Sequence, residues 1–188
     1  MPGPVRIACF GDSLTEGYGL SFDEALPAAL ERRLRDEGFD VVCLNHGVSG
    51  DTAGDGVQRL GSVLAEEPQA VVLEFGANDS FLDEAVEVVE AHLRILIERF
   101  RDDGVPVLLV GVNAGLNPDS VYRKRFEAIF PALAERYRLP LFPDILATYQ
   151  DDPALTLMDG LHPNAAGVET MARALLPQVA ELARSVSA

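Results

Sequence analysis

Short apolar runs alternate with longer amphipathic stretches along the whole chain. The runs are rich in Val, Ile, Leu and Phe, which is typical of buried strands. They predict strands at 5–10, 40–45, 70–75, 105–112 and 139–142. The stretches between them have the spacing of helices that bury one face. They predict helices at 22–37, 52–66, 83–102, from about 120 to 137, and 164–184.

Local signals support the helix boundaries. Ser21 and Glu24 have the spacing of a capping box, and Gly38 and Gly104 each follow the end of an expected helix. The helix at 83–102 has the clearest periodicity. Its apolar face consists of Val86, Val89, Leu93, Leu96, Ile97 and Phe100.

Strands that alternate with helices indicate a parallel sheet covered on both faces. Right-handed crossovers then predict a three-layer α/β/α fold, a doubly wound parallel sheet of five strands in the order 2-1-3-4-5. The length suits a single domain over residues 1–188. Ligands of such sheets bind beyond the carboxyl ends of the strands. The loops after the first three strands are therefore of interest: GDSLTEGYG, HGVSGDT and GANDS.

Composition and net charge limit the kinds of partner that the protein can bind. Hydrophobic residues make up 48% of the chain and the formal net charge is −15. An acidic surface without a dense run of Lys and Arg argues against nucleic-acid binding. It also argues against stable association with an anionic membrane. No apolar run is long enough to span a bilayer, and no leader is visible. We expect a cytoplasmic protein, or a periplasmic or secreted one if a leader was removed. The oligomeric state stays open.

The two cysteines lie in different expected strands. Cys9 and Cys43 are expected to be buried thiols. A disulfide remains open if the two strands are neighbours.

A fourth segment, MDGLHPN at 158–164, adds a candidate base. Asp159 and His162 are three residues apart, so the carboxylate can reach Nδ1–H of the imidazole and leave Nε2 free. Pro163 suits the first turn of the following helix. A base of this kind needs a nucleophile, and the Ser13 hydroxyl needs such a base to attack an acyl group.

Attack by Ser13 would create an oxyanion that needs donors. The backbone N–H groups of Ser13 and Gly50 and the side-chain amide of Asn78 are candidates. Each loop alone also has an ordinary explanation. Ser13 could occupy a simple turn, Thr52 could cap a helix, and Asn78 could adopt a left-handed turn.

Together the segments FGDSLTEGYG, GVSGDT, GAND and DGLHPN resemble the four blocks of the GDSL, or SGNH, hydrolase family. They occur in the family's order and span residues 10–164. The chain is most similar to the bacterial acyl-CoA thioesterase, arylesterase and lysophospholipase branch. The segment FEAIFPALAERYRLPLFP, which is not catalytic, is also similar to that branch.

The resemblance implies an SGNH hydrolase fold, which is flavodoxin-like, with Ser13 as the nucleophile and His162 as the general base and then the acid. It implies that Asp159 orients His162, and that Gly50 and Asn78 form the oxyanion hole with the Ser13 amide. It implies no metal, no organic cofactor and a shallow, mobile site. One departure is Ala77, where this branch often has a second glycine.

Several neighbouring residues are expected to be structural rather than chemical. Asp12 is expected to form hydrogen bonds within its loop, and Asp51 and Asp79 are expected to hold theirs. Thr15 and Glu16 have no role that the sequence assigns.

The loop at 111–122 would meet the same sheet edge and is a candidate acyl groove. Its apolar candidates for substrate binding are Leu116, Val121 and Tyr122, although the last two could instead begin a helix and pack inward. The expected substrates are small acyl esters or thioesters. One alternative is a carbohydrate acetylesterase of the same family. Another is a non-catalytic flavodoxin-like protein in which GDSLT binds an anion or a flavin.

Overall fold

The computed structural model describes residues 3–187, and its centre is a parallel sheet. The strands have the order β2-β1-β3-β4-β5, as the sequence predicts. Their bounds are β1 Val5–Gly11, β2 Val41–Gly47, β3 Ala70–Glu74, β4 Val107–Val110 and β5 Leu141–Phe142. All four neighbouring pairs are parallel, so every strand ends at the same edge.

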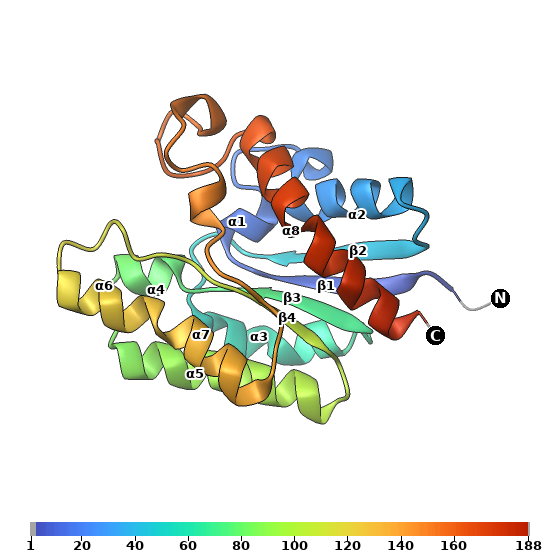
Figure 1. The fold of residues 1–188 in the computed structure, drawn as a ribbon, viewed down its shortest axis with the longest axis horizontal. Helices are drawn as coiled ribbons and strands as arrows, with labels where there is room; N and C mark the ends of the chain where they lie inside the picture. The colour runs from blue at the N-terminus through green and yellow to red at the C-terminus, as the bar shows by residue number, and fades with distance from the viewer. Residues whose placement is uncertain (1–2, 188) are drawn as a thin grey trace.

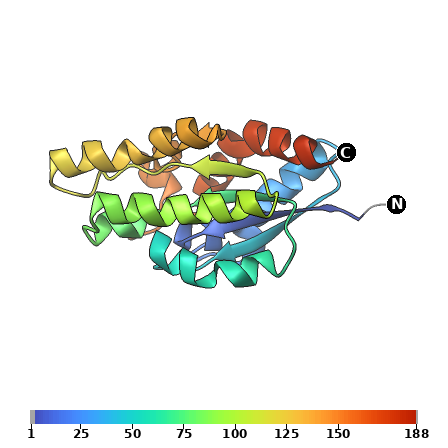
Figure 2. The ribbon, with the colours of Figure 1, turned by 90° about the horizontal axis from the view of Figure 1, so that it is seen from below.

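Helices cover both faces of the sheet (Figures 1 and 2). On one face α2 (Leu26–Asp36) packs against α8 (Ala165–Val186). On the other face lie α3 (Ala53–Leu64), α5 (Val86–Asp102) and α7 (Ile129–Tyr137). Within residues 3–187, no helix combines the length and the apolar character needed to cross a membrane.

Short elements surround the carboxyl edge of the sheet. The helices α1 (Ser13–Glu16) and α4 (Ala77–Phe81) follow β1 and β3 almost directly. The helix α6 (Ser120–Glu127) follows the loop after β4. The 3₁₀-helices are η1 Phe22–Glu24, η2 Leu146–Thr148 and η3 Pro153–Leu155. In Figure 1 α1, α4 and α6 lie to the left, away from both chain ends.

An aromatic cluster joins the sheet to the face that carries α3 and α5. The Phe10 ring meets Phe75 edge-on at 5.0 Å between centroids and Phe100 at 6.0 Å. The Arg59 guanidinium lies 4.5 Å from the centre of the Phe10 ring. It also donates hydrogen bonds to the carbonyls of Gly11 and His46, where β1 and β2 end. Arg59 therefore holds the ends of these two strands together.

Several element boundaries differ from those expected. The helix expected at 22–37 is divided, because the Ser21–Glu24 capping box closes the separate turn η1 and α2 starts afterwards with Pro27 in its first turn. The stretch expected to be one helix at about 120–137 is two helices, α6 and α7. Asn164, not Pro163, caps α8, so Pro163 precedes the helix rather than entering its first turn.

The third loop folds into a helix that the sequence pattern did not predict. Gly76, with φ of 129°, turns the chain after β3, and α4 begins at the next residue. Asn78 is therefore helical rather than left-handed. Cys9 and Cys43 are both buried free thiols, so the disulfide left open by the sequence does not form.

Gly47, at the end of β2, packs closely against α1, and Gly61 in α3 offers a matched control for this contact. A Cβ at Gly47 would lie 2.0 Å from the backbone nitrogen of Glu16, whereas a Cβ at Gly61, inside α3, would meet nothing within 4 Å. We expect Gly47→Ala to lower the free energy of unfolding by roughly 1–3 kcal/mol, because backbone cannot yield as a side chain does. Gly61→Ala should raise it by about 0.5–1 kcal/mol. Urea unfolding of both variants checks this, and equal effects would contradict the packing described.

Candidate active site

Ser13 is presented by a very short strand–turn–helix unit. β1 ends at Gly11, and Asp12 caps α1 by accepting a hydrogen bond from the Leu14 N–H at 2.9 Å. Gly17, with φ of 90°, ends the helix after one turn. The Ser13 side chain therefore stands at the carboxyl edge of the sheet, on the first residue of a helix.

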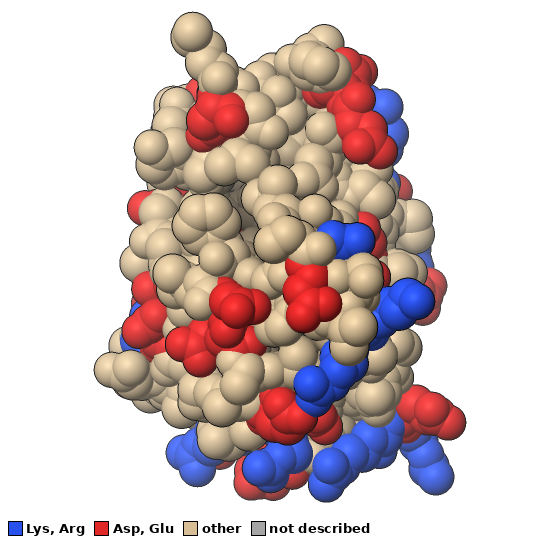
Figure 3. All heavy atoms as spheres, turned by 90° about the vertical axis from the view of Figure 1, so that its left-hand side faces the viewer, with Lys and Arg blue, Asp and Glu red and all other residues tan. Residues whose placement is uncertain are grey.

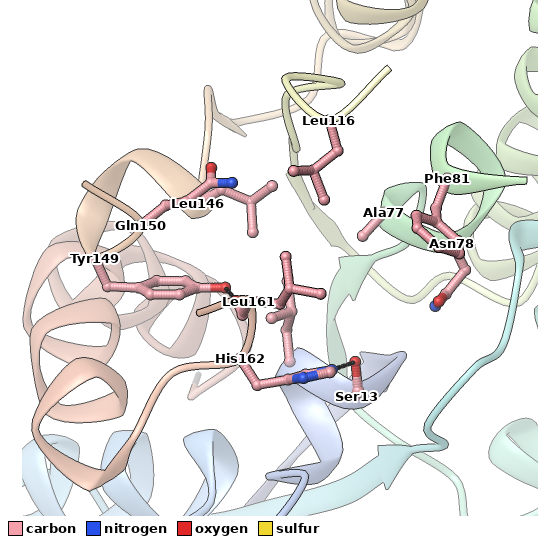
Figure 4. Close-up of a pocket in the computed structure, with 11 residues that line it drawn as sticks. Ser13, Ala77, Asn78, Phe81, Leu116, Leu146, Tyr149, Gln150, Leu161 and His162 are labelled. Carbon is pink, nitrogen blue, oxygen red and sulfur yellow. Dashed lines mark hydrogen bonds between the residues drawn. The ribbon is translucent and has the colours of Figure 1, made fainter. Parts of the chain in front are cut away.

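The loop before α8 brings His162 to Ser13. The distance from His162 Nε2 to Ser13 Oγ is 3.1 Å, and that from His162 Nδ1 to Asp159 Oδ2 is 2.7 Å (Figure 4 shows the first contact). With Nδ1–H donated to the carboxylate, Nε2 is left to accept the serine hydroxyl hydrogen. The structure thus brings together the three residues that the sequence singled out.

The Asp159 carboxylate is held by its own loop. Its Oδ1 accepts hydrogen bonds from the N–H groups of Leu161 at 2.9 Å and His162 at 3.0 Å. Desolvation raises the pKa of Asp159, but these hydrogen bonds and the one from the imidazole outweigh it and lower that pKa to about 2. The Asp159 carboxylate is therefore ionised at neutral pH and able to accept the imidazole N–H.

Two tyrosines outside the Ser13–His162–Asp159 chain of contacts also hold the His162 loop and ring in place. The Tyr149 hydroxyl donates to the carbonyl of Leu161 at 2.9 Å and ties the loop to the end of η2. The Tyr18 ring lies 4.3 Å from the His162 ring and covers one of its faces. The sequence reasoning missed both tyrosines, because no local pattern indicates a contact made through the fold.

Asn78 lies in α4 and Gly50 in the loop after β2, both in segments that follow strands next to β1. The Nδ2 group of Asn78 donates to the carbonyl of Asp51 at 2.9 Å and to Oδ2 of Asp12 at 3.2 Å. Both hydrogens of this amide therefore have acceptors in the resting structure. Gly50 has φ of 88°, a left-handed conformation that suits glycine.

The acids of these loops have structural partners. Asp51 forms an ion pair with Arg59 at 2.5 Å, and Asp79 accepts the backbone N–H of Ala53 at 3.0 Å. Both contacts agree with the loop-holding role expected for these residues. Glu16, without an expected role, accepts hydrogen bonds from the backbone N–H and the hydroxyl of Ser49, and thereby ties α1 to the Gly50 loop.

A pocket of about 210 Å³ opens beside Ser13. Its wall is mainly apolar, and Figure 3 shows a hollow on this side of the molecule bordered largely by uncharged atoms. The lining residues are Ser13, Leu14, Ala77, Asn78, Phe81, Leu116, Leu146, Tyr149, Gln150, Leu161 and His162. Leu116 is therefore where the sequence placed it, and the departure at Ala77 puts a methyl group into the wall.

Val121 and Tyr122, the other two candidates for substrate binding, do not line this pocket. The Tyr122 ring stacks on Phe126 at 5.8 Å, and its hydroxyl donates to the carbonyl of Glu84 at 2.8 Å. Val121 is exposed at the start of α6. The side chains that take their place in the wall, Leu146 and Phe81, come from elements that the sequence pattern did not predict.

The described part of the chain, residues 3–187, contains no group of three His, Cys, Asp or Glu side chains arranged to hold a metal ion.

The sequence matches the GDSL-like Lipase/Acylhydrolase family over residues 9–169. The chain belongs to this family. An arylesterase of Vibrio mimicus is 33% identical over 84% of this chain and 80% of its own. The thioesterase 1/protease 1/lysophospholipase L1 of Escherichia coli is 30% identical over 90% of this chain and 82% of its own. A crystal structure of TesA superposes with a TM-score of 0.87, at 30% identity, over 94% of this chain and 99% of that one. The chain is accordingly an ester hydrolase with the SGNH hydrolase fold.

Proposed function

We propose that this esterase hydrolyses carboxylic esters and thioesters through an acyl-enzyme on Ser13, as an arylesterase, acyl-CoA thioesterase or lysophospholipase. The observation that carries the proposal is the chain of contacts from Ser13 to His162 and Asp159, at 3.1 and 2.7 Å, at the mouth of an apolar pocket. The names of the relatives support the same substrate classes.

The reaction would proceed in two halves. His162 Nε2 accepts the Ser13 proton as Oγ attacks the acyl carbon, and the negative charge that develops on the acyl oxygen is stabilised by the N–H groups of Ser13 and Gly50 and the Asn78 amide. His162 then donates the proton to the leaving alcohol or thiol. In the second half His162 takes a proton from water, which attacks the acyl-enzyme, and then returns that proton to Ser13 Oγ as the acid is released.

The pocket favours an acyl chain over a sugar. Apart from the reacting groups, its lining offers mainly aliphatic and aromatic carbon, and the Tyr149 hydroxyl is already bonded to Leu161. A carbohydrate would need many more polar partners. None of the described residues that line the pocket is Lys or Arg, so its wall offers no cation to a flavin phosphate, which argues against the non-catalytic flavin-binding alternative. The net charge of −15 likewise argues for a small-molecule substrate rather than nucleic acid.

The nucleophile and base are tested by truncation. Ser13→Ala and His162→Ala should each lower kcat by roughly 10⁶-fold, and the double variant should be little worse, because the two groups act as one unit. Hydrolysis of a p-nitrophenyl ester measures this. Ser62→Ala and His92→Ala, which change the same residue types in α3 and α5, serve as controls and should keep full activity. Substantial turnover by Ser13→Ala would remove the nucleophile assignment.

The acyl groove is tested at Leu116. Each methylene that the groove buries contributes about 0.8 kcal/mol at most to the binding free energy, and an open groove gives less. The enzyme should therefore accept a broad range of acyl lengths. Leu116→Arg should lower kcat/KM for longer acyl chains and leave hydrolysis of a short aryl acetate nearly unchanged.

The matched control for this change is Val121→Arg, which adds the same charge to the same loop region outside the pocket. Its chain-length profile across an ester series should run parallel to that of the wild type. A parallel profile for Leu116→Arg as well would show that Leu116 does not contact the acyl chain.

A further inference from the structure

Two buried carboxyl groups lie next to the nucleophile, and the reaction scheme above uses neither. Asp12 is 0% exposed and Glu74, the last residue of β3, is 1% exposed. Oε2 of Glu74 accepts a hydrogen bond from the Thr15 hydroxyl at 3.0 Å and a longer one from the Asp12 N–H at 3.4 Å. Its Oε1 is buried and has no hydrogen-bond partner among the described residues.

Such a pair resists losing its last proton. Two neighbouring carboxylates that are removed from water repel each other, so one of them retains its proton. Burial raises the pKa of Glu74 to about 7, although hydrogen bonds from Thr15 and Asp12 oppose the change. Burial and the neighbouring Glu74 raise the pKa of Asp12 well above its usual range. Near neutral pH the pair therefore carries one negative charge rather than two.

The charge on Asp12 matters because Asp12 binds Asn78. One hydrogen of the Asn78 amide is donated to Asp51 and the other to Asp12, so Asn78 can donate to a reacting oxygen only if one of them is released. The contact with Asp12, at 3.2 Å, is the longer of the two. A neutral carboxyl is a weaker acceptor than a carboxylate, so it gives up this hydrogen more easily. A neutral Asp12 also avoids repelling the negative charge that develops nearby.

We propose that Glu74 is a positioning residue that acts through Asp12. The negative charge of the buried Glu74 carboxylate keeps Asp12 protonated and neutral, and this lets the Asn78 amide turn its hydrogen toward the oxyanion. This inference rests on the proposed function, because it requires the oxyanion hole that the Ser13 mechanism needs.

The other charged or titratable groups near Asp12 and Glu74 do not remove the proton from Asp12. Asp79, on α4, adds negative charge and favours retention of the proton by both carboxyls. Burial, with Glu74 and Asp12 close by, raises the pKa of Tyr149, at the end of η2, so its phenol stays neutral. Arg59, on α3, directs its guanidinium to Asp51 and to backbone carbonyls. His162 is engaged with Ser13 and Asp159.

The test is the pH dependence of kcat for p-nitrophenyl acetate hydrolysis. The wild type should show a falling limb at high pH, where the acid pair loses its last proton. Glu74→Gln removes the neighbouring charge and adds an amide donor, so Asp12 ionises more readily and the falling limb moves to lower pH. On that limb kcat should approach the roughly 10²-fold loss that follows removal of an oxyanion donor, with little change in KM.

Thr15→Val should shift the limb in the same direction, by less. The Thr15 hydroxyl stabilises the Glu74 carboxylate, so without it Glu74 takes up the proton more readily, Asp12 is ionised more often, and the falling limb moves to lower pH. Glu127→Gln is the matched control: it makes the same chemical change at an exposed carboxylate whose Oε1 accepts the Ala114 N–H, and it should leave the limb in place.

Two results would overturn the proposal. One is a falling limb at the same pH in the wild type, Glu74→Gln and Thr15→Val. The other is an equal loss of kcat at every pH, which would mark a purely structural role for Glu74. Thermal unfolding shows whether Glu74→Gln folds. If it does not, the pH of the falling limb in Thr15→Val decides whether the proposal holds. Activity in Ser13→Ala would instead contradict the proposed function, so the two failures are distinguishable.

Discussion

The site depends on one geometric constraint, the parallel alignment of β1, β2 and β3. Because these strands run in the same direction, the segments that follow them meet at one edge although they are far apart in the chain. The contact between Ser13 and His162 joins residues 149 positions apart. Arg59 strengthens the same edge by binding the ends of β1 and β2 together while its charge is matched by Asp51. A shift of either strand would move the Ser13 and Gly50 loops relative to each other.

The sheet and the reacting side chains were predictable because their signals are local. Apolar runs marked the strands, and the short spacing between Asp159 and His162 already indicated a carboxylate–imidazole pair. The strand order followed from the alternation of strands and helices. Ser13 could be placed at the correct edge because it comes directly after a buried strand.

The pocket wall was less predictable because it is made by contacts between distant segments. The run ANDSF has no pattern that predicts a separate helix. Gly76, with its positive φ, turns the chain there and orients Phe81 toward the pocket. Leu146 enters the wall from a 3₁₀ turn in a segment without periodicity. Tyr122 was a reasonable candidate from its loop position, but its helix register turns it toward Phe126. Side-chain direction at a helix start is decided by packing, which the sequence pattern does not contain.

In the proposed mechanism, the reacting side chains and part of the acyl-binding wall come from different segments. Ser13, Asp159 and His162 lie on α1 and on the loop before α8, whereas Leu116 and Leu146 come from the connections after β4 and β5. Substitutions in the connection after β4 can reshape this part of the pocket wall without moving Ser13 or His162, whereas the connection after β5 also carries His162 and the Tyr149 contact to its loop. The exception is α4, which carries both Asn78 and Phe81 and is tied through Asn78 to Asp12 and Asp51. If the proposed roles hold, a change that shifts α4 alters acyl binding and oxyanion stabilisation together, because Phe81 and Asn78 lie on the same short helix.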